Sequence, residues 1–255
     1  MAADSRYTAH YERLASSYDS NWVASSSFVE WMAESIRTVL GVRDGDVVLD
    51  VGGGTGMYAE RILAGSPKPS LVLVLDPSSA MLSQVPIRKD LAAFEGDASA
   101  APACLRSVNR TYANAIFVKE AVHHFDDPSR DLGTLASCLA LDGRLLVVLL
   151  PPTIEYPLFS AALRAFERHQ PHFEYIANCM RSAGLTVRVE SRSFQVSIPT
   201  SIYLTMVSNR YMSLLSDFSD EELAAGIQEM RTQLRGIDPV TFPDTFCFVV
   251  GSSRG

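Results

Sequence analysis

Three glycines alternate along the stretch between residues 52 and 56, and an aspartate stands just before them. Gly52, Gly54 and Gly56 follow a short apolar run at 47–51 that is typical of a buried parallel strand. A helical pattern begins at residue 57, so the glycines are predicted to turn a strand into a helix. Such a turn brings backbone N–H groups close to a ligand, because a Cβ atom here would hold the ligand away.

The spacing of these glycines favours one class of ligand over another. A dinucleotide site uses the pattern G-x-G-x-x-G, and Met57 or Tyr58 stands where its third glycine would be. The carboxylate of Asp50 would repel a pyrophosphate, whereas it would attract a cationic ligand with an amino group. We therefore expect a cationic ligand, and a tight turn without any ligand is the alternative.

A second acidic residue, Asp76, ends the apolar run at 71–75. It lies about 20 residues beyond the glycines, where α/β nucleotide folds place a carboxylate on the ribose hydroxyls. A carboxylate can accept hydrogen bonds from both hydroxyls and so fix the sugar. A solvated strand end or a helix cap is the alternative.

Two adjacent histidines, His123 and His124, follow a fourth apolar run at 113–118. Ligands of open α/β sheets gather beyond the carboxyl ends of the strands, so one histidine with a near-neutral pKa could serve as a general base. Purely structural histidines are the alternative. Adjacent side chains on a helix point about 100° apart, so the pair cannot chelate one metal ion, and no metal site is expected.

The stretch 47–56 resembles motif I of the class I S-adenosylmethionine-dependent methyltransferases, and further motifs follow in order across residues 7–150. The resemblance implies that S-adenosyl-L-methionine is the cofactor, with its amino-acid part at Asp50 and the glycines and its ribose at Asp76. The two histidines match a subgroup of small-molecule enzymes similar to the ubiquinone and menaquinone methyltransferases.

The same resemblance assigns residues outside the glycine turn to the cofactor. Tyr18, in a segment with Ala15 and Asp19, is expected to cover it, and an aromatic packing stripe is the alternative. The other expected contacts are the segment of Pro77 and Met81, with Met81 against the adenine, Asp97 with Ala98 at the adenine amino group, and Lys119 at the methionine carboxylate or the substrate. For Asp97, a simple glycine–aspartate turn is the alternative.

Apolar runs alternate with helical patterns up to residue 150, which indicates a doubly wound α/β sheet. The resemblance implies a Rossmann-like sheet of seven strands, the last one antiparallel, with helical lid elements at the N-terminus and between the last two strands. We expect the strands at 47–51, 71–76, 91–95, 113–118, 144–150, 186–189 and 246–250.

A single methyltransferase domain is expected over residues 1–255, divided into a lid at 1–24, a cofactor-binding core at 25–150 and a C-terminal part at 151–255. An insertion at about 190–238 would join the last two strands and roof the acceptor site. Tyr203 and Arg210 of this insertion are the candidate substrate contacts, because an arginine among apolar and aromatic residues could clamp a carboxylate. A surface ion pair of Arg210 with Asp217 or Asp220 is the alternative.

Composition limits the possible partners. The net charge of −7 argues against a nucleic-acid groove as the main surface. No apolar run approaches the roughly 18 residues of a membrane span, and the first residues lack the apolar core of a signal peptide. The four cysteines are far apart in the sequence and fit free thiols in a reducing compartment, so we expect a cytoplasmic protein.

The function that these features favour is methyl transfer from S-adenosyl-L-methionine to oxygen, carbon, nitrogen or a carboxylate of a small molecule, by a monomer or homodimer. A general base is needed only if the acceptor must lose a proton. Two alternatives stay open: a non-catalytic, methyltransferase-like binding protein and, less favoured, an NAD-dependent oxidoreductase.

Overall fold

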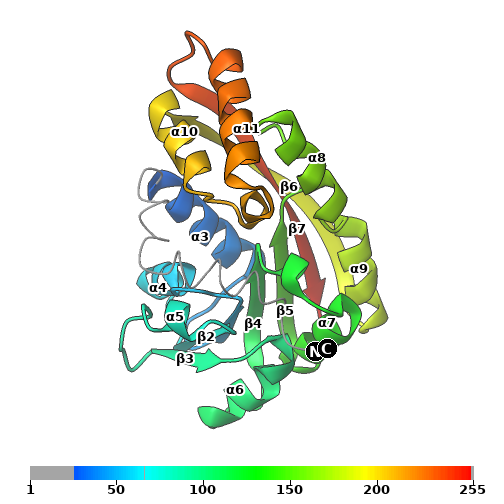
Figure 1. The fold of residues 1–255 in the computed structure, drawn as a ribbon. Helices are drawn as coiled ribbons and strands as arrows, with labels where there is room; N and C mark the ends of the chain where they lie inside the picture. The colour runs from blue at the N-terminus through cyan, green and yellow to red at the C-terminus, as the bar shows by residue number, and fades with distance from the viewer. Residues whose placement is uncertain (1–25, 66, 254–255) are drawn as a thin grey trace.

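Seven strands form one sheet in the computed structural model, which describes residues 26–65 and 67–253 (Figure 1). The strands are β1 (Val47–Val51), β2 (Leu71–Asp76), β3 (Leu91–Glu95), β4 (Ala113–Lys119), β5 (Leu139–Leu149), β6 (Thr186–Ile198) and β7 (Val240–Ser252), in the spatial order β3-β2-β1-β4-β5-β7-β6. The first five strands pair in parallel, and β7 lies antiparallel between β5 and β6. This confirms the expected Rossmann-like sheet with an antiparallel last strand.

Helices cover both faces of the sheet. One apolar cluster joins the sheet to α3 (Ser26–Leu40) and α4 (Met57–Ala64), and a second joins it to α6 (Ala101–Ser107), α7 (Pro128–Ser137) and α9 (Phe173–Ser182). Successive strand residues point to opposite faces, so Val48 and Leu49 of β1 belong to different clusters. Shorter elements are α5 (Ser79–Leu82), η1 (Ala98–Ala100) and η2 (Val122–His124).

The order of the strands fixes where a ligand can bind. β1 has β2 on one side and β4 on the other, so the direction of the chain's progress across the sheet reverses at β1. Ligands of open α/β sheets bind beyond the carboxyl ends of the strands at such a reversal. The glycine turn, Asp76 and the histidine pair all follow the carboxyl ends of β1, β2 and β4.

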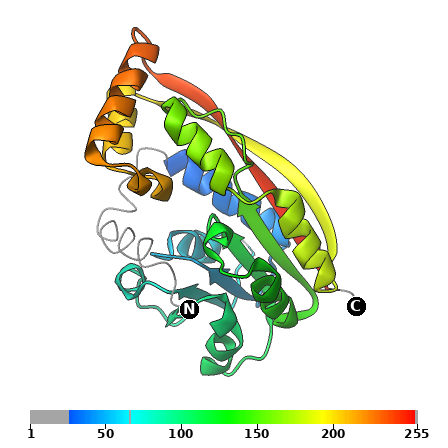
Figure 2. The same cartoon turned by 45° about the vertical axis from the view of Figure 1, so that its right-hand side comes forward.

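The last two strands are much longer than the sequence indicated. β7 pairs with β5 only as far as Leu149↔Cys247, and it then continues beside β6 alone to Ile198↔Val240. Figure 2 shows this two-stranded ribbon running past the end of β5. The helical connection therefore spans 199–239 rather than about 190–238, and contains α10 (Thr200–Ser208), η3 (Ser213–Asp217) and α11 (Asp220–Gln233).

The far end of the ribbon is held by apolar packing against helices. Phe194 of β6 meets Phe28 of α3, with ring centroids 5.5 Å apart. Gly226 lets α11 approach α8 (Ser160–His169) closely, since a Cβ there would stand 2.5 Å from the Phe159 ring. Ser219 and Glu222 form the capping box at the start of α11.

None of the helices in the described part of the chain is long and apolar enough to cross a membrane. All four cysteines are buried free thiols.

Candidate functional site

The backbone conformation of the turn and the residues packed against it both require glycine. Gly52, Gly54 and Gly56 have φ angles of 70°, 56° and 77°, which favour glycine. A Cβ on Gly52 would also stand 2.3 Å from Ala121 Cβ, in the segment that follows β4. The turn is therefore packed directly against that segment.

The N–H groups of the three glycines are used within the protein. Gly52 donates to the carbonyl of Leu75, Gly54 to the Asp76 carboxylate and Gly56 to the carbonyl of Gly53. These three N–H groups are therefore engaged within the protein, and the binding of a ligand at the turn stays a prediction.

Asp50 is a buried carboxylate beneath the turn, 2% exposed. Gly53 makes room for it, since a Cβ on Gly53 would stand 2.6 Å from Asp50 Cγ. Burial raises the pKa of Asp50 well above its usual value; nearby Asp76 raises it further and Lys119 lowers it. Among the described residues, Oδ2 of Asp50 has no hydrogen-bond partner. An amino group of a ligand would supply that partner, so the site fits a cationic amino acid.

Asp76 joins the end of β2 to the glycine turn. Its Oδ2 accepts from Gly54 N at 2.9 Å, and its Oδ1 accepts from Ser78 N at 2.8 Å. Burial raises the pKa of Asp76, and these two hydrogen bonds lower it again in part. Each oxygen keeps a further lone pair, so both could still accept from vicinal hydroxyls.

The segment after β2 places Met81 against the turn. Ser78 caps α5 by accepting from Met81 N, and buried Met81 would touch a Cβ on Gly54 at 2.9 Å. Pro77 stands between Asp76 and this cap. Asp76 and Met81 therefore both lie against Gly54, and the cofactor contacts expected of Pro77 and Met81 stay predictions.

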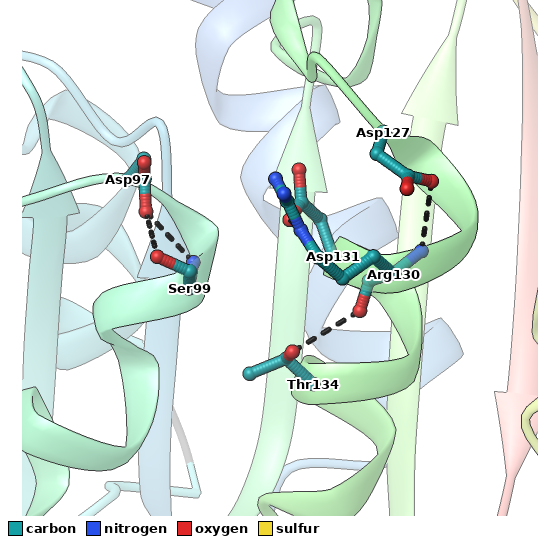
Figure 3. A network of polar contacts seen from close by, with 6 residues as sticks. All are labelled: Asp97, Ser99, Asp127, Arg130, Asp131 and Thr134. Atoms are coloured by element: carbon teal, nitrogen blue, oxygen red, sulfur yellow. Dashed lines mark hydrogen bonds and ion pairs between the residues drawn. The ribbon is translucent and has the colours of Figure 1, made fainter. Parts of the chain in front are cut away.

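Asp97 is an exposed cap at the end of β3. Its Oδ1 accepts from both N and Oγ of Ser99, at 2.9 and 2.5 Å (Figure 3). The next residue, Ala98, is buried. Oδ2 of Asp97 takes part in neither bond. Asp127 caps α7 in the same view by accepting from Arg130 N. The turn alternative is thus realised at Asp97, and its adenine contact stays a prediction.

The histidines lie on the short η2 turn rather than on an α-helix, with ring centroids 4.0 Å apart. Burial lowers the pKa of His123 well below its usual value, and the neighbouring His124 and Lys119 lower it further. The expectation of a near-neutral pKa is therefore wrong for His123. Its Nδ1 is buried without a hydrogen-bond partner among the described residues.

Lys119 ends β4 between two aromatic rings. Its Nζ lies 5.3 Å from the Tyr58 ring centroid and 5.7 Å from that of Phe246, so both rings offer cation–π contact. The ammonium also lowers the pKa of the Asp50 carboxyl. Lys119 thus stands between the glycine turn and β7.

A second group of acids was missed by sequence reasoning. Asp244 of β7 is 5% exposed, and its Oδ1 accepts from Tyr156 Oη at 2.6 Å. Burial raises its pKa to about 6, against the lowering effects of Tyr156 and Lys119. Glu120 accepts from Leu150 N at 2.8 Å, and burial raises its pKa to about 7.

Arg210 is occupied within the connection between β6 and β7. Its guanidinium donates to the carbonyls of Leu215 and Phe218 and pairs with Asp220 at 2.8 Å. The ion-pair alternative is the arrangement observed, so the prediction of a substrate clamp at Arg210 loses its basis. Tyr203 is 1% exposed, packed 5.6 Å from the Phe242 ring, so it forms part of the core there.

Two other expectations have a simpler outcome. Tyr18, with the whole proposed lid, lies outside the described residues. In 26–65 and 67–253, no three His, Cys, Asp or Glu side chains are grouped so that they could hold a metal ion.

Comparison with known proteins decides the family. A family model described as a methyltransferase domain matches residues 28–190, more than half of the chain. The chain belongs to the class I S-adenosylmethionine-dependent methyltransferases. The matched range contains the glycine turn, Asp76 and the histidine pair.

One curated relative of this methyltransferase is the demethylmenaquinone methyltransferase of Chlamydia pneumoniae, 30% identical over 156 residues. That match covers 59% of the chain and 64% of the relative, which is less than two thirds of the relative's length.

Solved structures share the fold at low identity. A protein described as a methyltransferase from an antibiotic biosynthesis pathway of Anabaena variabilis superposes with a TM-score of 0.65 at 16% identity, over 86% of this chain and 96% of that one. A phosphoethanolamine N-methyltransferase of Haemonchus contortus, in complex with phosphomonomethylethanolamine and S-adenosylhomocysteine, has a TM-score of 0.54 at 15% identity, over 88% of this chain and 52% of that one.

Proposed function

We propose that this protein binds S-adenosyl-L-methionine and transfers its methyl group to a small-molecule acceptor. The observation that carries the proposal is the Asp76 carboxylate, which lies beside the glycine turn with one hydrogen bond on each oxygen. The unpartnered Oδ2 of buried Asp50 suits the amino group of the same ligand. The relatives named above support a small acceptor, because demethylmenaquinone and phosphomonomethylethanolamine are both small molecules.

Each of these residues would bind a different part of S-adenosyl-L-methionine. Asp76 would hold the ribose hydroxyls, Met81 would lie against the adenine, and Asp50 and the glycine turn would receive the amino-acid part. When bound, the cofactor supplies a methyl group on a sulfonium, which is a good leaving group. The protein then accelerates transfer chiefly by holding the acceptor in line with that methyl group.

Calorimetric titration with S-adenosylhomocysteine tests the cofactor assignment. Losing charge-assisted hydrogen bonds to the ribose costs on the order of 2–4 kcal/mol, so Asp76→Ala should weaken binding roughly 30- to 1000-fold. Asp76→Asn, which keeps one carbonyl oxygen, should lose less. Asp90→Ala is the matched control, since Asp90 precedes β3 at the opposite edge of the sheet.

Asp76 also accepts from two backbone N–H groups, so circular dichroism and a thermal melt must show that each variant is folded. An unchanged dissociation constant for folded Asp76→Ala would contradict the assignment. A parallel titration with NADH should give no binding. Transfer of labelled methyl groups to a metabolite panel then separates an enzyme from a protein that only binds the cofactor.

A further inference from the structure

Asp244 interrupts the apolar row on the inner face of β7. Residues at alternate positions of a strand share a face, and the neighbours of Asp244 in this row, Phe242 and Phe246, are both buried. A buried carboxylate in such a row is costly unless it is partnered. A polar residue kept in this place at a cost to stability is a candidate for function.

Chain topology brings Asp244 to the ligand edge of the sheet. β7 is antiparallel to β5, and Asp244 lies three residues before Cys247, the last residue paired with β5. Asp244 therefore stands beyond the carboxyl end of β5, on the ribbon of β6 and β7 that Figure 2 shows continuing past β5. β4 ends at the same edge with Lys119, which pairs with Val148 of β5.

Charged and titratable groups from several elements interact electrostatically with the Asp244 carboxylate. The segment after β5 contributes Tyr156, the end of β4 contributes Lys119 and Glu120, and α4 contributes Tyr58. Tyr203 of α10 and Tyr211 complete the set. Only one of these groups is a cation.

Three polar atoms in or beside this cluster lack hydrogen-bond partners among the described residues. They are Oη of Tyr203, Oη of Tyr58, a residue 8% exposed, and Nδ1 of His123. The last two lie close to Lys119, which contacts the Tyr58 ring and acts on the pKa of His123. Buried polar atoms are rarely left unpaired, so a polar ligand is needed here to complete the cluster.

We propose that Asp244 binds the methyl acceptor through an O–H or N–H group at the atom to be methylated, with Tyr156 holding the carboxylate in place. This rests on the proposed methyltransferase function and names its acceptor class. The acceptor oxygen or nitrogen forms the new bond to the methyl carbon as the S–CH₃ bond breaks, and the sulfur keeps that electron pair. The proton of the acceptor goes to the Asp244 carboxylate.

Two other nearby groups could take this proton. Glu120, like Asp244, is held at one oxygen, with Oε1 accepting from Leu150 N, but it follows the end of β4 and stands outside the row of Phe242, Asp244 and Phe246 on β7. His123 stays neutral, but burial beside Lys119 makes it a weak base. Oδ1 of Asp244 accepts from Tyr156 Oη, and the Tyr156 ring lies 5.0 Å from that of Phe242, the preceding member of the same row of β7.

A cofactor-binding measurement first separates this proposal from the proposed function. S-adenosylhomocysteine should bind wild type, Asp244→Asn and Tyr156→Phe within about twofold of one another by calorimetry. If wild type fails to bind, the proposed function fails. If only Asp244→Asn fails to bind, Asp244 belongs to the cofactor site and the present inference is overturned.

The acceptor test measures transfer of a labelled methyl group to two sets of small molecules. The first half of this panel carries an O–H or N–H at the accepting atom, and the second half consists of carboxylates and thiolates that carry no such proton. We expect transfer to the first half, with kcat of Asp244→Asn lowered about 100-fold or more. Exposed Asp217→Asn is the matched control and should keep full turnover. Transfer to the second half alone, or to none of the panel, overturns the inference.

The pH profile supplies a readout that a structural role would not move. Wild-type kcat should rise with pH through about 6, as the Asp244 carboxyl ionises. Tyr156→Phe should shift this rise to higher pH, because the Tyr156 hydrogen bond lowers the pKa of Asp244. Carbon-13 NMR of the aspartate carboxyls should show the same shift without any acceptor. Full turnover of folded Asp244→Asn, or a rise that vanishes in His123→Gln instead, would overturn the assignment.

Discussion

At the scale of single residues, Asp50 and Gly53 form one unit. The buried carboxylate occupies the space that a side chain at position 53 would take. Gly53→Ala would place a Cβ 2.6 Å from Asp50 Cγ and 2.8 Å from Val74 Cγ1. Since neither neighbour can withdraw from the core, we expect a loss of about 1–3 kcal/mol in the free energy of unfolding, measured by chemical denaturation.

Gly133 is the matched control for Gly53. It lies inside α7, and a Cβ there would meet nothing within 4 Å. Gly133→Ala should stabilise the protein by up to about 1 kcal/mol, because alanine has the higher helix propensity. If Gly53→Ala were as stable as wild type, the close packing of Asp50 under the turn would be wrong.

The position of the proposed cofactor residues at the ligand edge could be predicted from the sequence, whereas that of Asp244, the proposed acceptor residue, could not. Gly52, Gly54 and Asp76 stand directly after apolar runs, so their place at the ligand edge follows from local strand–turn–helix patterns. Asp244 reaches the same edge only because β7 extends past β5. Pro243 and Asp244 look like a turn in the sequence, and the sheet tolerates Pro243 because β7 is paired on one side only at this point.

At the scale of elements, the ribbon of β6 and β7 shows why strand length was underestimated. Val187 and Val189 of β6 pack on the α9 side, whereas Phe194 and Val196 pack on the α3 side. The face of the strand that is buried thus changes between Val189 and Phe194. Glu190 and Arg192 lie in this interval and form an ion pair. The alternation of apolar residues loses its phase there, so a period-two pattern detects only the first part.

Arg210 stabilises the connection carried by this ribbon. Its side chain is 12% exposed and binds two carbonyls and Asp220. Arg210→Ala should lower the free energy of unfolding by about 2 kcal/mol, because it leaves two partly buried carbonyls without their donor. Exposed Arg231→Ala in α11 is the control and should change stability little.

Kinetics separate this structural role from the substrate clamp that the sequence suggested. With an acceptor in hand, Arg210→Lys should keep both KM and kcat, since a lysine restores part of the contacts within the connection. A KM raised tenfold or more, at unchanged stability, would instead restore Arg210 as a substrate contact.

At the scale of the whole molecule, buried acids make stability depend on pH in an unusual direction. Burial raises the pKa of Asp244 from an ordinary 3.8 to about 6 and that of Glu120 from 4.5 to about 7. At pH values between the ordinary and the raised pKa of each acid, the folded state binds more protons than the unfolded state. The free energy of unfolding therefore falls as the pH rises through this range. The stability contributed by the protonated acids is complete below about pH 4 and lost above about pH 7.

Substitution of Asp244 separates its contribution to the pH dependence of stability from that of the other titrating groups. Asn at position 244 keeps an oxygen for the Tyr156 hydroxyl and carries no charge, so Asp244→Asn should gain on wild type as the pH rises. The gain between pH 4.5 and 7.5 should be about 2 kcal/mol, since one pKa unit corresponds to about 1.4 kcal/mol. Denaturation of ligand-free protein at several pH values measures it, with Glu167→Gln, an exposed residue of α8, as the control. A constant difference between Asp244→Asn and wild type across this range would show that Asp244 ionises as it does in the unfolded chain. The carboxyl would then be too acidic in the folded protein to take a proton from the acceptor at neutral pH.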